Sequence, residues 1–337
     1  MPKDFLDLDA TPERLRALAE AGVLPPAALE RALHLSVASP PRAEWRRFLS
    51  TSLMGLGALL VLSGVIYFFA YNWADLHRFA KLGLLMVAIA STAVGAWRQG
   101  AQLSGQFSLL ASAVLVGALL AVYGQAYQTG ADPYELFLGW GVLILPWVAV
   151  SRFGPLWLLL LVLANTGITL FWAQVLDGDE KTAAWLAVAL GVLNGFAWAT
   201  YEHFANAGVA WLQSRWMPRV LAVMTVAPLL TAAEVFIVAP SEVGPGAGVA
   251  LLLVLGSLAA DYALHRHLRG ELFLLTLGVL CVMTMLTTFV GRVFIVDAKL
   301  EVEFILFVLP FIIIGQVALA VWWLRNEARA TGATEEG

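Results

Sequence analysis

Polar and aromatic residues are concentrated between Gly124 and Trp140, a short stretch that joins two long apolar segments. Seven amide, hydroxyl and carboxyl side chains fall within a dozen positions there: Gln125, Tyr127, Gln128, Thr129, Asp132, Tyr134 and Glu135. Carboxylates can act as general acids or bases, and amides both donate and accept hydrogen bonds. The stretch is therefore the first candidate for binding or chemistry.

A second polar corner runs from Asn72 to Lys81 and begins with Asn72 and Trp73. Both corners follow apolar segments that run in the same direction, so we expect them to emerge on the same face and to meet. In the first stretch, Gly124, Gly130 and Pro133 are each expected to break regular helix. Asp132 precedes Pro133 in the pattern of a helix start, where its carboxylate would cap the next helix. Capping is the structural interpretation of Asp132, and ligand binding is the functional one.

The composition predicts an all-α protein that crosses a membrane many times. Hydrophobic residues make up 60% of the 337 positions and charged residues 13%, against about a quarter charged residues in soluble domains. A helix needs about 20 apolar residues to cross the hydrocarbon. Apolar runs of that length predict ten spans: residues 50–71, 80–98, 105–124, 134–150, 153–174, 182–200, 218–238, 247–264, 271–290 and 302–324.

The chain divides by composition into four parts. Residues 1–44 are polar and predict a short helical hairpin that starts near Pro12 and again near Pro26. Residues 45–150 hold spans one to four, residues 151–326 hold the remaining spans, and residues 327–337 are expected to be a disordered tail. The leader at 1–44 is either a folded N-terminal element or a docking site for a protein partner.

Arginine and lysine residues favour one orientation in the membrane. They are concentrated at the ends that would share a side with the N-terminus, and cytoplasmic loops carry an excess of these residues. The pattern predicts that both termini lie in the cytoplasm and that both polar corners face outward.

Two predicted spans carry a polar side chain six residues after a proline. Glu234 follows Pro228, and Gln316 follows Pro310. A carboxylate in hydrocarbon is costly unless it is protonated, paired or hydrated, so Glu234 is a candidate functional residue. The alternatives are that it reaches the membrane surface or pairs with Arg292. Asn165 and Asn194, by contrast, are expected to bond to neighbouring helices.

Known catalytic patterns are missing from the sequence. It has no phosphate-binding glycine loop, nucleophile elbow or zinc-binding helix motif, and Cys281 is its only cysteine. We expect no cofactor, no metal site and no nucleic-acid partner, and membrane lipids are the expected surroundings. Three functions remain: transport of a small molecule or ion through a polar cavity, a structural or sensory role with a partner at residues 1–44, or an envelope lipid or glycan enzyme using Asp132 and Glu135. Transport is favoured, and an enzyme is the least favoured of the three.

The two polar corners also resemble a known family. The matching motifs are Tyr71-Asn72-Trp73-Ala74-Asp75-Leu76 with Lys81, and Gly124-Gln125-Ala126-Tyr127-Gln128-Thr129-Gly130-Ala131-Asp132-Pro133-Tyr134-Glu135-Leu136-Phe137. They are similar to bacterial predicted membrane proteins grouped as domain of unknown function 2157, over about residues 10–150. The resemblance implies a multi-span membrane topology and an inner-membrane location, and it brings no activity, substrate or cofactor.

Overall fold

The computed structural model describes residues 12–37, 42–71, 77–128, 130, 132–267 and 272–334. Over these residues the chain forms helices and no strand, which confirms the predicted all-α class. The chain separates into two compact units, residues 1–76 and 77–337.

The first unit contains the predicted helical hairpin. Helices α1 (Pro12–Glu20) and α2 (Pro26–Val37) pack against each other, and α3 (Arg42–Tyr71) follows. Gly22 ends the first helix with a φ of 72°, and the Val23 N–H donates to the Leu18 carbonyl at 2.9 Å. This is the left-handed termination that favours glycine after a helix. The N-terminal hairpin is thus formed where the proline and glycine residues predict it.

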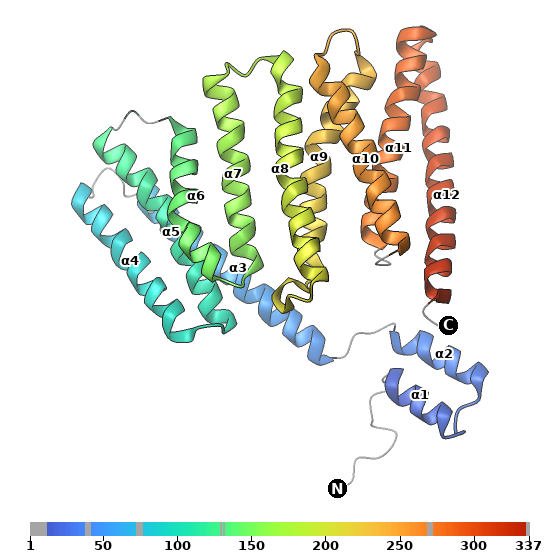
Figure 1. Ribbon diagram of the computed structural model, residues 1–337, viewed down its shortest axis with the longest axis horizontal. Coiled ribbons are helices and arrows are strands. Elements are labelled where there is room, and N and C mark those ends of the chain that lie inside the picture. Colours follow the sequence, from blue (N-terminus) through green and yellow to red (C-terminus); the bar gives the residue numbers. More distant parts are fainter. Residues whose placement is uncertain are drawn as a thin grey trace. The chain divides into compact units, whose positions relative to one another are not determined.

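The second unit is a set of helices that run antiparallel in chain order (Figure 1). Its members are α4 (Arg78–Gln99), α5 (Leu103–Tyr127), α6 (Pro133–Val150), α7 (Gly154–Val175), α8 (Glu180–Asn206), α9 (Trp216–Val238), α10 (Pro245–His267), α11 (Leu272–Arg292) and α12 (Val302–Thr334). A 3₁₀ turn (Ala210–Leu212) precedes α9, and a π turn (Val293–Asp297) follows α11.

The helices account for the predicted membrane spans one for one. Among the described residues, nine helices are long and apolar enough to cross a membrane, and α10 adds a shorter apolar part, Pro245–Ala260. The short break between the fourth and fifth predicted spans is present, since α6 ends at Val150 and α7 begins at Gly154. The chain is therefore a multi-pass membrane protein.

Close approach of neighbouring helices depends on glycine. A Cβ added to Gly191 of α8 would lie 2.4 Å from Leu229 Cγ of α9, and one added to Gly117 of α5 would lie 2.4 Å from the Trp140 ring of α6. The Trp140 Nε1–H donates to the Ala113 carbonyl at 2.7 Å. Small residues let helix backbones approach closely in a membrane, where packing rather than water drives association.

A pair of asparagines joins three helices. Asn165 of α7 and Asn194 of α8 exchange hydrogen bonds at 2.9 and 2.8 Å, and Asn194 Nδ2 also donates to the Met224 carbonyl of α9 at 3.1 Å. Asn194 is 1% exposed. The predicted role of these asparagines as interhelical hydrogen-bond partners is confirmed.

Helix α12 extends beyond the predicted tenth span. The span was predicted to end at residue 324, but α12 continues to Thr334, and the last three residues lie outside the described part. Ala328, Arg329 and Ala330 follow the apolar part of the helix, and alanine and arginine are strong helix formers. The helix therefore outlasts the hydrophobic run that defined the predicted span.

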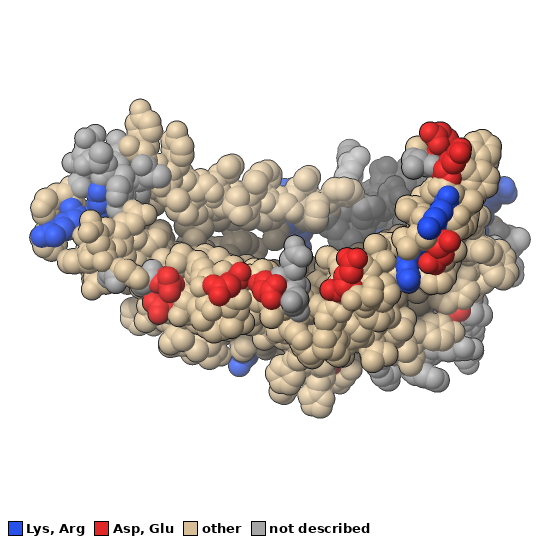
Figure 2. Space-filling view, turned by 90° about the horizontal axis from the view of Figure 1, so that it is seen from above, with Lys and Arg blue, Asp and Glu red and all other residues tan. Residues whose placement is uncertain are grey.

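Charges separate to opposite ends of the second unit. The end that carries the α5–α6, α7–α8, α9–α10 and α11–α12 connections is called the acidic end, and Figure 2 shows red side chains along it. Its acidic residues are Asp132, Glu135, Asp177, Asp179, Glu242, Asp297, Glu301 and Glu303, beside the basic residues Arg78, Lys81, Arg292 and Lys299. The opposite, basic end carries Arg98, Arg152, Arg215, Arg219 and Arg325 together with Glu202 and Glu327.

Candidate functional site

The polar stretch after Val122 begins inside a helix rather than in a loop. Helix α5 continues through Gly124 to Tyr127 and ends at Gln128, whose φ of 46° is left-handed. Gln125 and Tyr127 therefore belong to the last turn of α5, which corrects the expectation that Gly124 breaks the helix. A helical glycine is only modestly unfavourable, and the apolar packing of α5 outweighs it.

Helix α6 begins at Pro133, as predicted, but the Asp132 side chain makes no capping hydrogen bond. Instead the Tyr134 N–H donates to Gln174 Oε1 of α7 at 3.4 Å, and the Tyr134 ring packs edge-on against Phe171 at 5.3 Å. An amide from the neighbouring helix thus serves the free N–H group at the start of α6. The hydrogen bond by which the Asp132 carboxylate was expected to cap α6 is therefore not formed.

Most of the predicted corner residues lie on an open surface. Gln125, Tyr127, Gln128, Asp132 and Glu135 are all exposed. The Tyr134 hydroxyl lies 3.5 Å from Glu135 Oε1, the outer limit for a hydrogen bond. The two carboxylates therefore face solvent, without the enclosure that raises the reactivity of a catalytic acid or base.

The two polar corners contact each other through Arg78 and Tyr127. The Arg78 guanidinium carbon lies 5.9 Å from the centre of the Tyr127 ring, within the range of a cation–π interaction. Asn72 and Trp73, which were expected in the same site, lie outside the described residues. The structure thus places the start of α4 beside the end of α5.

Glu234 is the most unusual polar residue within the membrane spans. Both of its carboxylate oxygens are buried and have no hydrogen-bond partner. It lies six residues after Pro228 in α9, a helix that packs on α10 and α11. Arg292 Nε is also buried without a partner, so the expected alternative of a Glu234–Arg292 pair is not formed here.

Gln316 in α12 is also incompletely bonded. It is 9% exposed, and its Oε1 accepts a hydrogen bond from the Thr287 hydroxyl of α11 at 3.0 Å. Its Nε2 is buried and has no partner. Glu234 and Gln316 thus lie on two proline-containing helices, α9 and α12, that both pack against α11.

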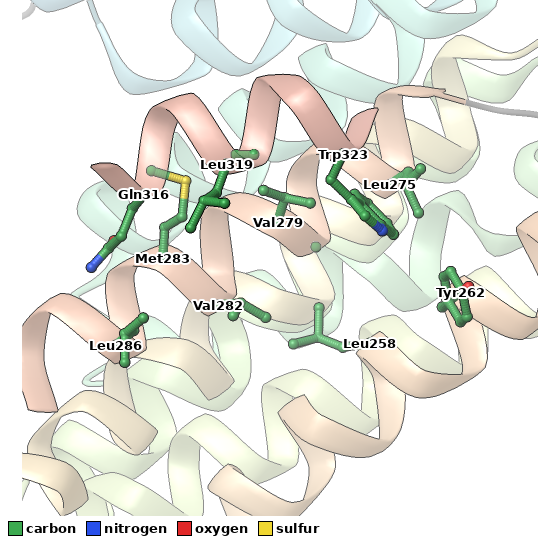
Figure 3. A pocket seen from close by; sticks show the side chains of 12 residues that line it. Leu258, Tyr262, Leu275, Val279, Val282, Met283, Leu286, Gln316, Leu319 and Trp323 are labelled. Carbon is green, nitrogen blue, oxygen red and sulfur yellow. The ribbon is translucent and has the colours of Figure 1, made fainter. Parts of the chain in front are cut away.

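Among the described residues, two of the grooves between helices are large enough for a small molecule. The first, of about 370 Å³, is formed by α10, α11 and α12 and is shown in Figure 3. The second, of about 640 Å³, is formed by α7, α8, the 3₁₀ turn and the start of α9, and aromatic residues such as Trp157, Phe196 and Trp211 line it. Apolar side chains dominate both walls, so neither groove is the polar cavity expected for a transporter.

Comparison with known proteins gives one result. Residues 16–157 match the family described as Predicted membrane protein (DUF2157). The resemblance carried by the two polar corners is confirmed over this region, which extends from α1 to the first residues of α7. No curated protein and no solved structure matches the chain.

The DUF2157 region and the buried polar residues occupy different parts of the chain. Gln125, Tyr134 and Glu135 lie inside the matched region, whereas Glu234 and Gln316 lie beyond it. Among the described residues, no group of three or more histidine, cysteine or acidic side chains could hold a metal ion. The second half of the chain therefore holds the polar groups that most need a functional explanation.

Sequence reasoning did not find Thr287 or Trp198. Trp198 Nε1 of α8 is buried without a partner, and Thr287 orients the amide of Gln316. Tryptophan and threonine are common in membrane helices, so neither residue type distinguishes itself in the sequence. Only the packing of the helices reveals them.

Proposed function

We propose that the protein transports a small molecule across the bacterial inner membrane and that Glu234 accompanies this transport by taking up and releasing a proton or a small cation. The observation that carries the proposal is the pair of buried, unpartnered carboxylate oxygens of Glu234 inside a membrane helix. Ionisable residues in such positions are rare and mark ion or substrate pathways.

The energetics of burial support a coupled ion. An anionic carboxylate taken out of water without a hydrogen bond or a counter-ion is strongly unfavourable. A proton or cation bound to Glu234 would remove that cost, and its departure would restore it. The packing between α9 and α11 would then differ between the two forms, because α9, which carries Glu234, lies against α11.

The proline residues supply places where these helices can bend. Pro228 and Pro310 each remove one backbone N–H from the helix interior. Helices interrupted near a polar side chain are a feature of transporter binding sites. Helix α11 lies against both α9 and α12. It is therefore the element through which Glu234 could influence the groove between α10, α11 and α12.

The charge distribution supports the proposed orientation. The basic end carries arginines at four helix connections or termini, and the acidic end carries most of the carboxylates. The basic end would face the cytoplasm by the positive-inside rule. Both termini would then be cytoplasmic, and the leader at residues 1–44 would be available there to a protein partner.

A deletion strain provides the test. Metabolites and lipids would be measured inside and outside cells that lack the gene and in cells complemented with wild type, Glu234→Gln or Glu242→Gln. Glu242 is an exposed carboxylate at the α9–α10 corner and serves as the matched control. Wild type and Glu242→Gln should restore the distribution of the affected compound, and Glu234→Gln should not, at equal protein levels in the membrane.

Two results would count against the proposal. Full complementation by Glu234→Gln would remove the role of the carboxylate. Complementation by Glu234→Gln combined with failure of a variant lacking residues 1–41 would favour the structural or sensory function, in which the leader binds a partner.

A further inference from the structure

We propose that the groove between α10, α11 and α12 binds a compact apolar molecule that is dissolved in the bilayer and carries a carbonyl-type hydrogen-bond acceptor. Gln316 Nε2 would donate to that acceptor. The inference rests on the proposed transport function, because it names the class of substrate that this function would move.

The groove has the character of a small-molecule site. Its volume of about 370 Å³ lies within the usual range for ligand pockets, which are mostly apolar with a few placed polar groups. Figure 3 shows Gln316 at one end and Tyr262 at the other, with Val279, Leu319 and Trp323 between them. A ligand that enters the groove would leave the lipid hydrocarbon and contact leucine, valine and aromatic side chains instead. Both surroundings are apolar, so these contacts alone give little selectivity between apolar ligands.

Gln316 supplies the selectivity that the apolar wall lacks. Its Oε1 is occupied by the Thr287 hydroxyl, which fixes the orientation of the amide. Gln316 lines the groove, and its Nε2 is buried beside the groove without a hydrogen-bond partner. A buried donor without an acceptor is unfavourable by about 1–3 kcal/mol. A ligand that brings an acceptor would satisfy it, whereas a pure hydrocarbon would not.

The depth of Gln316 excludes ordinary phospholipid as the occupant. Gln316 lies near the middle of the apolar part of α12, Glu303–Glu327. Trp323 is seven residues further along, about 10 Å at the rise of an α-helix, and it packs near Tyr262 with ring centres 6.1 Å apart. The ester carbonyls of a glycerophospholipid lie at the membrane surface. The acceptor that meets Gln316 must instead lie deep in the hydrocarbon, in a molecule without a charged headgroup.

Benzophenone and diphenylmethane form a matched pair of probes. Both are compact and apolar, and only benzophenone carries a carbonyl. Their binding to the full-length protein in lipid nanodiscs would be compared for wild type, Gln316→Met and Trp198→Phe. Trp198→Phe is the control because it removes a buried, unpartnered N–H that does not line this groove.

Wild type should prefer benzophenone over diphenylmethane by roughly three- to tenfold, the effect of one hydrogen bond. Gln316→Met should reduce the preference to about one while it keeps the binding of diphenylmethane, and Trp198→Phe should leave the preference unchanged. Illumination should form benzophenone adducts with groove residues such as Met283. Absence of the preference in wild type, its persistence in Gln316→Met, or adducts located only outside the groove would overturn the inference.

Two further variants keep the result interpretable if Gln316→Met does not fold. Leu319→Trp fills the groove and should weaken the binding of both probes. Ile314→Trp adds the same bulk to an exposed position of α12 outside the groove and should not. Equal effects of the two variants would contradict the site. If benzophenone binding depends on Gln316 but transport does not depend on Glu234, only the proposed function is rejected. If transport depends on Glu234 but benzophenone binding does not depend on Gln316, only the groove as a binding site is rejected.

Discussion

At the residue scale, the buried polar side chains of the spans fall into two kinds. Asn165 and Asn194 bond to each other across helices, and their amides also donate to the Leu161 and Met224 carbonyls, respectively. Glu234 and Gln316 leave oxygen or nitrogen atoms buried without partners. Because native proteins satisfy most buried polar groups, an unsatisfied one requires an explanation. The first kind should matter for stability and the second for function.

Removal of one asparagine of the pair should destabilise the protein. Asn165→Leu and Asn194→Leu should each lower the free energy of unfolding by about 1–2 kcal/mol, since the remaining amide stays buried and partly unpaired. The double variant should cost less than the sum of the two, because no orphaned amide remains. Unfolding by SDS in mixed micelles would measure this. Additive costs would show that the asparagines do not act as a pair.

Glu234 should behave in the opposite way. Glu234→Gln removes a charge but breaks no hydrogen bond or ion pair of the described residues, so thermal stability in detergent should be unchanged or higher. Arg292→Gln should be tolerated equally, because Arg292 Nε has no partner either. Loss of several kcal/mol in both variants would instead indicate a buried ion pair, for which breaking one partner is strongly destabilising.

The sequence identifies polar residue types but not the partners that folding gives them. Asn165 and Asn194 were predicted as interhelical partners because amides in apolar spans need such bonds. Asp132 was expected to cap α6, yet the acceptor for the Tyr134 N–H comes from Gln174, forty positions beyond Tyr134 in the chain. Gln316 was recognised, but its bond to Thr287 depends on how α11 and α12 pack. No local pattern encodes these pairings.

At the element scale, the α8–α9 contact depends on a missing side chain. Gly191→Ala would place a Cβ 2.4 Å from Leu229 Cγ, so the helices or the leucine must move. Overpacking of this kind costs about 1–3 kcal/mol. Gly256→Ala in α10 is the control, because its Cβ would meet nothing within 4 Å. Thermal unfolding in detergent should show a clear loss for Gly191→Ala only, and Leu229→Ala should partly restore it.

Hydrophobic runs predict where these elements lie better than where they end. All ten apolar helices occupy the predicted positions, because the bilayer requires about 20 apolar residues per crossing. The errors occur where a helix continues beyond its apolar run. Helix α5 extends to Tyr127 and α12 to Thr334. There, backbone hydrogen bonds and helix-forming residues determine the end, and hydrophobicity does not report them.

At the scale of the whole molecule, the separation of charge predicts which end of the bundle faces outward. In a Cys281→Ala background, Asp179→Cys and Ser241→Cys lie at the acidic end, and Ala101→Cys and Ala207→Cys lie at the basic end. All four positions are exposed. A membrane-impermeant maleimide should label the first two in intact cells and the other two only after permeabilisation. The reverse pattern would place both termini outside the cytoplasm.

Helix α10 decides the orientation of everything that follows it. Its apolar part, Pro245–Ala260, is shorter than the other candidate spans. If α10 crosses the membrane, Asp297→Cys should label in intact cells like Ser241→Cys, and Asn326→Cys should label only after permeabilisation. If α10 does not cross, α11 and α12 invert, and the two labelling results exchange. The inverted result would also place Arg266, Arg325 and Arg329 outside and Arg292 and Lys299 inside, which leaves more of these arginine and lysine residues outside than inside, against the positive-inside rule. We therefore expect labelling of Asp297→Cys from outside.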